Sequence, residues 1–288
     1  MFKITKAEQL TSNIYLMDVV APRVAKSCKP GQFIIVRLDE TAERIPLTIC
    51  DYDAEAGTVT IVFQPVGAST HKMTSLKAGD YFMDFVGPLG CPSELCDEDL
   101  EELKKKKILF VAGGVGTAPV YPQVKWLHER GIAVDVIIGA KTKDLVIYKE
   151  EMAAVCDNLY ICTDDGSEGF KGLVTAMLEK LVNEDGKVYD QAVAIGPMIM
   201  MKFATLTCKK LGLPVIVSLN TLMVDGTGMC GACRVTVAGK TRFACVEGPE
   251  FNGYDVDFDE AISRGTMYKR AETMKREESC NLLKKGAE

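Results

Sequence analysis

Asp225 and three cysteines, Cys230, Cys233 and Cys245, have the residue types and the spacing of an iron–sulfur site. A plant-type [2Fe–2S] ferredoxin loop has the spacing C-x4-C-x2-C with a fourth cysteine further along the chain, and here an aspartate stands at the first position. Three glycines lie between Asp225 and Cys233, as suits a loop that curls tightly and points N–H groups inward. The pattern predicts a cluster held by three thiolates and one carboxylate.

Two alternatives follow from the same residues. A structural zinc site normally uses four Cys or His ligands in two C-x2-C halves, whereas this chain has one such pair and an isolated Cys245, which favours iron–sulfur over zinc or a disulfide. An aspartate in a glycine-rich loop also shapes turns by accepting backbone N–H groups. If Asp225 has only that role, Cys208 or another distant thiol would supply the fourth bond.

Composition favours an intracellular redox protein over a secreted one. The chain has 288 residues, a formal net charge of −6 and an odd number of cysteines, 11. The net charge argues against nucleic-acid binding, and the sequence lacks the ~18 to 20 consecutive apolar residues of a membrane span. The first residues do not resemble a signal peptide, so we expect a cytoplasmic protein.

The first hundred residues predict a small antiparallel β-barrel. Short segments rich in Val, Ile, Phe and Tyr alternate there with turns that contain glycine. The predicted strands are Asn13–Val20, Gln32–Leu38, Thr58–Phe63 and Tyr81–Phe85.

From Lys107 onward the pattern changes to apolar strands that alternate with helices, which predicts a Rossmann-like α/β domain with a parallel sheet. The expected strands are Ile108–Ala112, Ala133–Ile138, Leu159–Thr163 and Gln191–Ile195, with helices through Trp126, near Leu173–Val182 and before Leu213. The charged run Glu101–Lys107 is interpreted as a solvated linker helix.

A glycine-rich turn, Gly114-Val115-Gly116-Thr117-Ala118-Pro119, follows an apolar strand and opens a helix. In this context glycines let the backbone approach a pyrophosphate, and the helix N-terminus stabilises its charge. Pro119 replaces the third glycine of the usual dinucleotide fingerprint, in the first helical turn where proline is well tolerated. Such turns also occur without ligands, so the motif alone is weak evidence.

A second motif, Arg44-Ile45-Pro46-Leu47-Thr48, begins a barrel strand. A guanidinium beside a rigid proline and a small hydroxyl residue suits a site that holds a diphosphate and faces a ring. The alternative is an ordinary surface arginine.

The order of motifs, R-x-P-L-T, G-P-L-G, G-G-V-G-x-A-P and Ile195-Gly196-Pro197-Met198, resembles the ferredoxin–NADP reductase superfamily over essentially the whole chain. The cysteine loop narrows the resemblance to electron-transfer subunits of dihydroorotate dehydrogenases, sulfide dehydrogenases and NADH-dependent reduced ferredoxin:NADP oxidoreductases. Asp225 and the run around it are most similar to the small subunits of the last group.

The resemblance implies a site made of three sets of residues. The residues implied for FAD are Arg44, Pro46, Leu47, Thr48, Gly67, Ser69, Thr70, Gly87, Pro88, Leu89 and Gly90. Of these, Thr48 would lie at the reactive edge of the ring and is the implied catalytic residue. The residues implied for the nicotinamide nucleotide are Gly114, Gly116, Thr117, Asp165, Gly166, Ser167, Gly196, Pro197 and Met198. The implied cluster ligands are Asp225, Cys230, Cys233 and Cys245.

The resemblance also implies a division into an FAD-binding barrel (1–100), an NAD(P)-binding α/β domain (101–218), a small [2Fe–2S] module (219–250) and a C-terminal tail (251–288). Electrons would pass between NAD(H), FAD and the cluster, and then to or from a larger partner that carries FAD and [4Fe–4S] clusters and reaches ferredoxin by electron bifurcation.

Three questions stay open at this point. NADP(H) is possible in place of NAD(H), since Lys141 and Lys143 could meet a 2′-phosphate or be solvated loop lysines. The subunit could serve a sulfide or dihydroorotate dehydrogenase instead. It could also be a non-catalytic redox sensor or carrier, although the intact Arg44–Thr48 motif counts against a chain without flavin.

Overall fold

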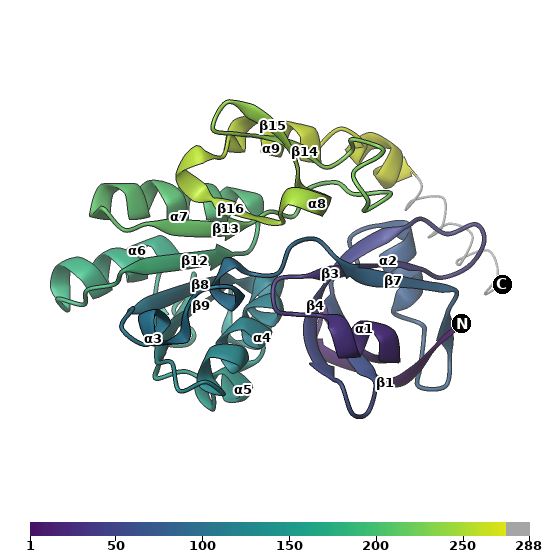
Figure 1. Cartoon of the computed structure of the whole chain (residues 1–288), viewed down its shortest axis with the longest axis horizontal. Coiled ribbons are helices and arrows are strands. Elements are labelled where there is room, and N and C mark those ends of the chain that lie inside the picture. The colour runs from purple at the N-terminus through teal and green to yellow at the C-terminus, as the bar shows by residue number, and fades with distance from the viewer. Residues whose placement is uncertain (275–288) are drawn as a thin grey trace.

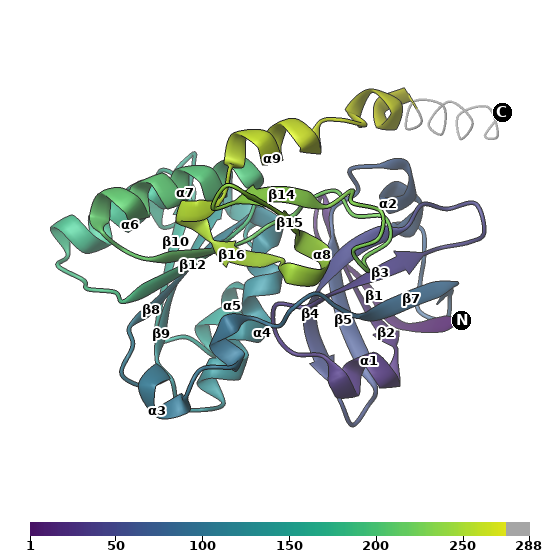
Figure 2. The same cartoon turned by 45° about the horizontal axis from the view of Figure 1, so that its top comes forward.

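The computed structural model describes residues 1–274 and contains two seven-stranded sheets and one two-stranded sheet. Figures 1 and 2 show the first sheet with the N-terminus at one end of the molecule, the second sheet at the other, and the C-terminal elements lying across both. None of the helices within residues 1–274 is long and apolar enough to cross a membrane.

The N-terminal sheet is an antiparallel barrel, as predicted. Its strand order is β6-β1-β2-β5-β4-β3-β7. Strands β6 and β7 are separated by one residue, Met83, yet stand at opposite ends of that order, so the sheet curls until it nearly closes. The elements are β1 (Phe2–Thr11), β2 (Ile14–Val20), α1 (Pro22–Ser27), β3 (Phe33–Arg37), β4 (Ile45–Asp53), β5 (Thr58–Phe63), α2 (Ala68–Met73), β6 (Tyr81–Phe82) and β7 (Asp84–Leu89).

The second sheet has the order β11-β10-β9-β8-β12-β13-β16 and is parallel except for β16. Its central strands are buried on both faces, which explains their continuous Val, Ile and Ala runs. The elements are η1 (Glu94–Cys96), α3 (Leu100–Leu103), β8 (Ile108–Gly113), η2 (Gly114–Gly116), α4 (Thr117–His128), β9 (Val134–Ala140), η3 (Lys143–Leu145), α5 (Lys149–Ala153), β10 (Asn158–Thr163), β11 (Phe170–Lys171), α6 (Val174–Glu179), η4 (Lys180–Glu184), β12 (Gln191–Ile195), α7 (Met198–Leu211) and β13 (Val215–Ser218).

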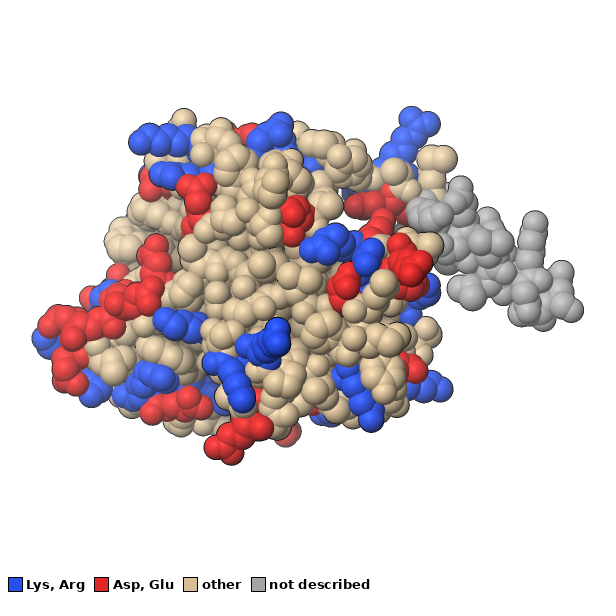
Figure 3. All heavy atoms as spheres, turned by 45° about the vertical axis from the view of Figure 1, so that its right-hand side comes forward, with Lys and Arg blue, Asp and Glu red and all other residues tan. Residues whose placement is uncertain are grey.

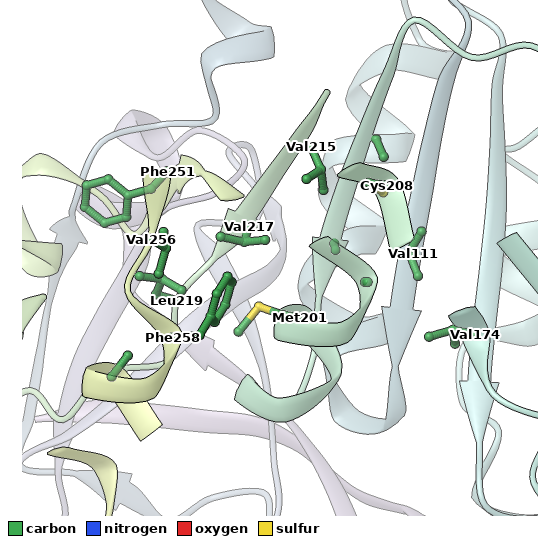
Figure 4. Packing of buried hydrophobic residues seen from close by; sticks show 14 of the residues in the cluster. Val111, Val174, Met201, Cys208, Val215, Val217, Leu219, Phe251, Val256 and Phe258 are labelled. Atoms are coloured by element: carbon green, nitrogen blue, oxygen red, sulfur yellow. The ribbon is translucent and has the colours of Figure 1, made fainter. Parts of the chain in front are cut away.

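The C-terminal elements pack on the second sheet and on α7. Figure 4 shows Phe258 beside Met201 of α7, with Val217 and Val256 close by. The remaining elements are β14 (Arg234–Val237), β15 (Lys240–Phe243), α8 (Ala244–Glu247), β16 (Glu250–Asn252), η5 (Gly253–Asp255) and α9 (Phe258–Gly265).

Two expectations about the segments that precede and follow the α/β domain differ from the structure. The linker helix is shorter than Glu101–Lys107, since α3 ends at Leu103 and the next residues turn into β8. The segment expected to be a tail from residue 251 begins inside β16 and continues into η5 and α9. Burial explains both: only Leu103 of α3 reaches the core, whereas Phe251, Phe258 and Ala261 are buried. Residues 275–288 of that segment lie outside the described residues.

The barrel and the α/β domain meet along a small apolar contact and an ion pair. Leu16 and Val62 of the barrel pack with Ala118 of α4, and Lys125 Nζ lies 2.9 Å from Asp51 Oδ1. On the face shown in Figure 3, basic and acidic side chains are mixed around a broad uncharged area rather than gathered into one basic field.

Candidate functional site

The glycine-rich turn lies at the carboxyl edge of the parallel sheet, where the strand order reverses between β8 and β12. Ligands of open α/β sheets bind at such a point. A Cβ at Gly116 would lie 2.5 Å from the Ile195 carbonyl oxygen and 2.7 Å from Gly196 Cα, so this glycine lets the turn pack on the end of β12. Gly114 has a φ of +56° and open space beside it. The two predicted glycines therefore have different structural roles.

Thr117 is the first residue of α4 and is fully buried, yet its Oγ1 has no hydrogen-bond partner among the described residues. A buried hydroxyl without a partner is costly, so such groups commonly mark an interaction with a ligand or water. Together with the open space at Gly114 and the N-terminus of α4, this hydroxyl fits the diphosphate of a nucleotide.

The other predicted nucleotide residues follow neighbouring strands at the same edge. Asp165 Oδ1 accepts hydrogen bonds from Ser167 N and Oγ at 2.9 and 2.7 Å, and these bonds lower the pKa of Asp165. Ser167 Oγ in turn accepts from Lys143 N at 2.8 Å. The bond between Lys143 and Ser167 links the turn after β9 to the turn after β10. Gly166 lies between Asp165 and Ser167 in the second of these turns.

The turn after β12 contains Gly196, Pro197 and Met198, and it includes a neighbour that the motif did not indicate. The sulfur of Met200 would lie 2.2 Å from a Cβ at Gly113 and 2.8 Å from one at Gly196. Met200 thus lies across the two glycines that border the strand-order reversal. In the sequence, the one indication that Met200 belongs to this site is its position two residues after Met198.

Strand β3 brings the two predicted flavin motifs together. Thr48 of β4 pairs with Phe33 from one side, and Leu89 of β7 pairs with Phe33 from the other; Leu47 and Pro46 follow along β3. Gly90 has a φ of +74°, and a Cβ there would lie 2.9 Å from the Phe33 ring. Gly87, Pro88, Leu89 and Gly90 therefore lie across β3 from Pro46, Leu47 and Thr48.

Gly67, Ser69 and Thr70 lie at the start of α2. Thr70 Oγ1 accepts from Gly67 N at 2.9 Å, and Ser69 Oγ donates to Glu43 Oε2 at 2.8 Å. A cavity of about 120 Å³ adjoins this turn and is lined by Glu43, Val66, Gly67, Ala68 and Glu272. The two hydroxyls thus hold the turn itself, and Gly67 and Ala68 border the cavity.

Arg44 contacts the cysteine loop. Its Nε donates to the Val224 carbonyl at 2.9 Å, and an Nη donates to the Asp225 carbonyl at 3.4 Å. A Cβ at Gly226 would lie 2.7 Å from Ile35 Cδ1 and 2.9 Å from Leu89 Cδ1, so the loop rests directly on the barrel. Arg44 therefore joins the flavin motif to the loop, a contact that the sequence did not predict.

The structure brings two of the four predicted ligands together. Cys233 and Cys245 are buried, with their sulfur atoms 3.2 Å apart. Burial, and next the neighbouring Cys233, raise the pKa of Cys245 to about 12. Cys230 is exposed, and its pKa is lowered chiefly by a hydrogen bond from the Ala232 backbone. Within residues 1–274 no three His, Cys, Asp or Glu side chains are close enough to hold a metal ion.

Asp225 shapes the loop through one carboxylate oxygen. Its Oδ2 accepts from Thr227 N at 3.0 Å, Thr227 Oγ1 at 2.5 Å and Met229 N at 3.3 Å, and the two bonds from Thr227 are the main reason that its pKa is lowered. Its Oδ1 accepts no hydrogen bond within the described residues, so turn formation leaves that oxygen available as a ligand. Cys208, the alternative thiol, is buried in α7.

Sequence reasoning missed Glu250, a buried carboxyl where three segments meet. Its Oε1 accepts from Gln123 Nε2 of α4 at 2.6 Å, and Gln123 Oε1 accepts from Ser93 Oγ at 3.2 Å. Burial raises the pKa of Glu250 to about 7, and Glu94 is a nearby charge that adds to the shift. A single acidic residue in a short strand carries no local signal of such burial.

Comparison with known protein families gives a match in the C-terminal part of the chain. Residues 220–257 match the model of the iron–sulfur cluster binding domain of dihydroorotate dehydrogenase B. The match contains the four predicted ligands, Asp225, Cys230, Cys233 and Cys245, and ends before α9.

Two relatives extend the similarity over the chain. One, a protein from Clostridium beijerinckii described as uncharacterized and encoded in the adh 3′ region, is 62% identical over 94% of this chain and 92% of its own length. The other is a homologue of the electron transfer subunit of dihydroorotate dehydrogenase B (NAD(+)) from Thermotoga maritima, 45% identical over 94% of this chain and 92% of its own length.

A solved structure agrees with these relatives. A chain from the structure of NADH-dependent reduced ferredoxin-NADP oxidoreductase, which was studied for flavin-based electron bifurcation, superposes with a TM-score of 0.88. It is 44% identical, and the match covers 96% of this chain and 97% of that one. These similarities support FAD, an iron–sulfur cluster and a nicotinamide nucleotide as cofactors. The chain belongs to the family of dihydroorotate dehydrogenase B-type electron-transfer subunits, within the ferredoxin–NADP reductase superfamily.

Proposed function

We propose that this chain is the small subunit of an electron-bifurcating, NADH-dependent reduced ferredoxin:NADP oxidoreductase. The observation that carries the proposal is the similarity to a chain of such an enzyme, at 44% identity over nearly the full length of both chains. Asp225 at the first position of the cysteine motif also supports the proposal. We expect the subunits of dihydroorotate dehydrogenases to have a cysteine at this position, whereas the small subunits of the ferredoxin:NADP oxidoreductases resemble this chain in having an aspartate.

The carboxyl edge of β8, β9, β10 and β12 would bind the nicotinamide nucleotide. We assign the diphosphate to the turn at Gly114 and to the unpaired hydroxyl of Thr117, and the nicotinamide to the turn that begins at Gly196. Met200, which lies across Gly113 and Gly196, would limit how deeply a ring can enter.

The barrel motifs on either side of β3 would hold FAD, with Thr48 beside the reactive edge of the ring and the Gly67 turn near the diphosphate. FAD would supply the step between two-electron hydride transfer and one-electron transfer to the cluster. Strand β3 lies between the two motifs, and because its Phe33, Ile34 and Ile35 are buried, it would help to orient these groups and to keep water from the site.

The cysteine loop would hold a [2Fe–2S] cluster through Cys230, Cys233, Cys245 and Oδ1 of Asp225. Cys233 and Cys245 already lie side by side with free thiols, so binding of the cluster requires Asp225 and Cys230 to approach these two residues. The lowered pKa of Cys230 favours the thiolate form that binds iron.

A larger partner would dock at this loop. Three apolar side chains around it are exposed, Val224 at 48%, Met229 at 88% and Val246 at 41%, and a Cβ at Gly228 would lie 3.1 Å from Val246. Exposed apolar groups beside a redox centre suit a partner that must exclude water and approach closely. We propose that this partner carries FAD and [4Fe–4S] clusters and exchanges electrons with ferredoxin.

The test is anaerobic affinity purification of the natural complex, followed by analysis of subunits, flavin and iron. We expect one larger flavin and iron–sulfur subunit and NADP reduction that needs both NADH and reduced ferredoxin; the small subunit, once separated, should contain about one FAD and two iron atoms. Dihydroorotate or sulfide oxidation by the complex would assign the chain to those enzymes instead. A flavin-free chain without a partner would favour a redox sensor.

NADH is the proposed nucleotide of this subunit, and NADP(H) is the alternative. Lys141 and Lys143 are exposed at the nucleotide edge, where Lys143 N donates to Ser167 Oγ and the Lys141 carbonyl accepts from Asp165 N. Flavin reduction by NADH and by NADPH should be compared in the wild type and in Lys141→Ala and Lys143→Ala. Loss of NADPH reactivity alone in either variant would indicate a 2′-phosphate contact.

A further inference from the structure

Residues 220–233, here called the cluster loop, contain neither helix nor strand and connect β13 to β14. Loops of this length within a compact domain are uncommon and need other contacts to hold them. Two arginines from distant parts of the chain make such contacts, one with each limb of the loop.

Arg44, just before β4 of the barrel, holds the first limb. It donates to the carbonyl oxygens of Val224 and Asp225, at 2.9 and 3.4 Å. One of the two carbonyls thus belongs to a predicted ligand, and the other belongs to the residue before it.

Arg264 of α9 holds the second limb in the same way. It donates from Nε to the Arg234 carbonyl and from an Nη to the Ala232 carbonyl, both at 3.1 Å. These two carbonyls immediately flank Cys233, whose sulfur lies 3.2 Å from that of Cys245. Each guanidinium therefore fixes the backbone at one predicted ligand.

We infer that Arg44 and Arg264 form a clamp that holds the cluster loop in place before the cluster is inserted and then sets the electrostatic environment of the cluster. The part of the inference that concerns the electrostatic environment of the cluster rests on the proposed function, whereas the part that concerns the loop does not. Toward the cluster both residues are positioning residues, because they bind backbone carbonyls of the loop and not the predicted ligand atoms.

The two sides of the clamp are anchored independently. Phe258 and Ala261 of α9 are buried against the core that includes Met201 of α7 (Figure 4). Arg44 is followed by β4, which pairs with β3 and β5. A guanidinium offers several donors in a rigid fork, so one side chain can bind two carbonyls at once, which a lysine cannot do with the same geometry.

Arg242 provides a matched control. It lies in β15, within the same module, but its Nη1 pairs with Glu247 Oε1 at 2.6 Å instead of with loop carbonyls. Arg242→Gln removes one positive charge from the module and leaves the clamp unchanged.

The first experiment is hydrogen exchange of the full-length, cluster-free chain. We expect Arg44→Gln to speed exchange of the amides around residues 224–229 by about 10-fold, and Arg264→Gln to do so around residues 231–235, because each loses charge-assisted hydrogen bonds. Arg242→Gln should exchange like the wild type in both limbs. Wild-type exchange in both limbs of the two clamp variants would overturn the inference.

The second experiment uses the reconstituted protein, redox titration and electron paramagnetic resonance. Reduction adds negative charge, so Arg264→Gln should lower the cluster potential, whereas Arg264→Lys should restore the potential but leave a broadened spectrum, since it keeps the charge without the fork. Unchanged potentials and spectra in both variants would refute the electrostatic half of the inference. A wild type that binds no iron would refute the proposed function, and the exchange experiment would still decide the clamp.

Discussion

The nucleotide edge and the cluster loop are two binding regions built in opposite ways. At the nucleotide edge the main chain itself sets the geometry, because Gly116 packs on the backbone of Ile195 and Gly196 at the ends of parallel strands. In the cluster loop the geometry depends on side chains, since Arg44, Asp225 and Arg264 bind backbone groups of a segment without helix or strand.

This difference predicts how each region responds to change. Substitutions that add atoms to the close packing of the nucleotide edge should act on the stability of the whole domain, because the turn shares this packing with the sheet. Substitutions in the cluster loop should act on loop order and cluster properties, because the strands on either side do not depend on the loop for their pairing. The four predictions below test this contrast, from the largest expected effect to the smallest.

Gly116→Ala should lower the free energy of unfolding by about 4 kcal/mol, because its Cβ would meet backbone atoms that cannot move independently. Gly114→Ala is the matched control, with open space and a φ of +56°, and should cost about 1 kcal/mol. Urea denaturation measures both. Equal losses in the two variants would mean that close packing does not set this edge.

Glu250→Gln should change how stability depends on pH. Between the ordinary pKa of 4.5 and about 7 the unfolded carboxyl is ionised while the buried native one stays protonated, so the wild type loses stability as pH rises through this window. The total loss is about 3 kcal/mol, and glutamine avoids it.

The measurement is the difference in unfolding free energy between Glu250→Gln and the wild type, from about pH 4 to about pH 8. The difference should grow in favour of the variant and level off above pH 7. A difference independent of pH would show that the pKa of Glu250 is the same in the native and unfolded protein, with Gln123 Nε2 then donating to an ionised carboxylate.

Thr117→Val should weaken nicotinamide nucleotide binding by about 10-fold while leaving the unfolding free energy within about 1 kcal/mol, because it removes a buried hydroxyl that has no partner in the described residues. Thr205→Val is the control: its Oγ1 is also buried and unpaired, but it lies in α7 within the core. Titration calorimetry gives the affinities. Equal affinity losses in both variants would remove Thr117 from the site.

Asp225→Cys should have the smallest effect, keeping the cluster and shifting its potential, because a thiolate carries the same formal charge as a carboxylate but shares electron density with iron differently. Asp225→Ala should lose iron. Iron analysis and redox titration distinguish the two roles of this residue. The same iron content and potential in all three proteins would leave Asp225 with only its hydrogen bonds to Thr227 and Met229.

The sequence alone predicted the elements whose burial is regular. Strands β5 and β12 have the predicted bounds, β3 is shorter by one residue at each end, and β8 is longer by one residue, since most residues of these strands are buried and apolar. β1 was missed because charged and polar residues occupy its exposed positions without clean alternation, and β6 and β7 were merged because nothing local marks the break at Met83.

The sequence by itself also determined which groups could bind cofactors, through motif spacing along short stretches of chain. Only the tertiary structure decided which partners those groups have. Arg44 binds a carbonyl 180 residues away, Glu250 binds Gln123 at a separation of 127 residues, and Arg264 reaches the loop from a separate helix. The physical reason is that spacing reports local geometry, whereas these hydrogen bonds depend on how the barrel, the sheet and α9 pack against one another.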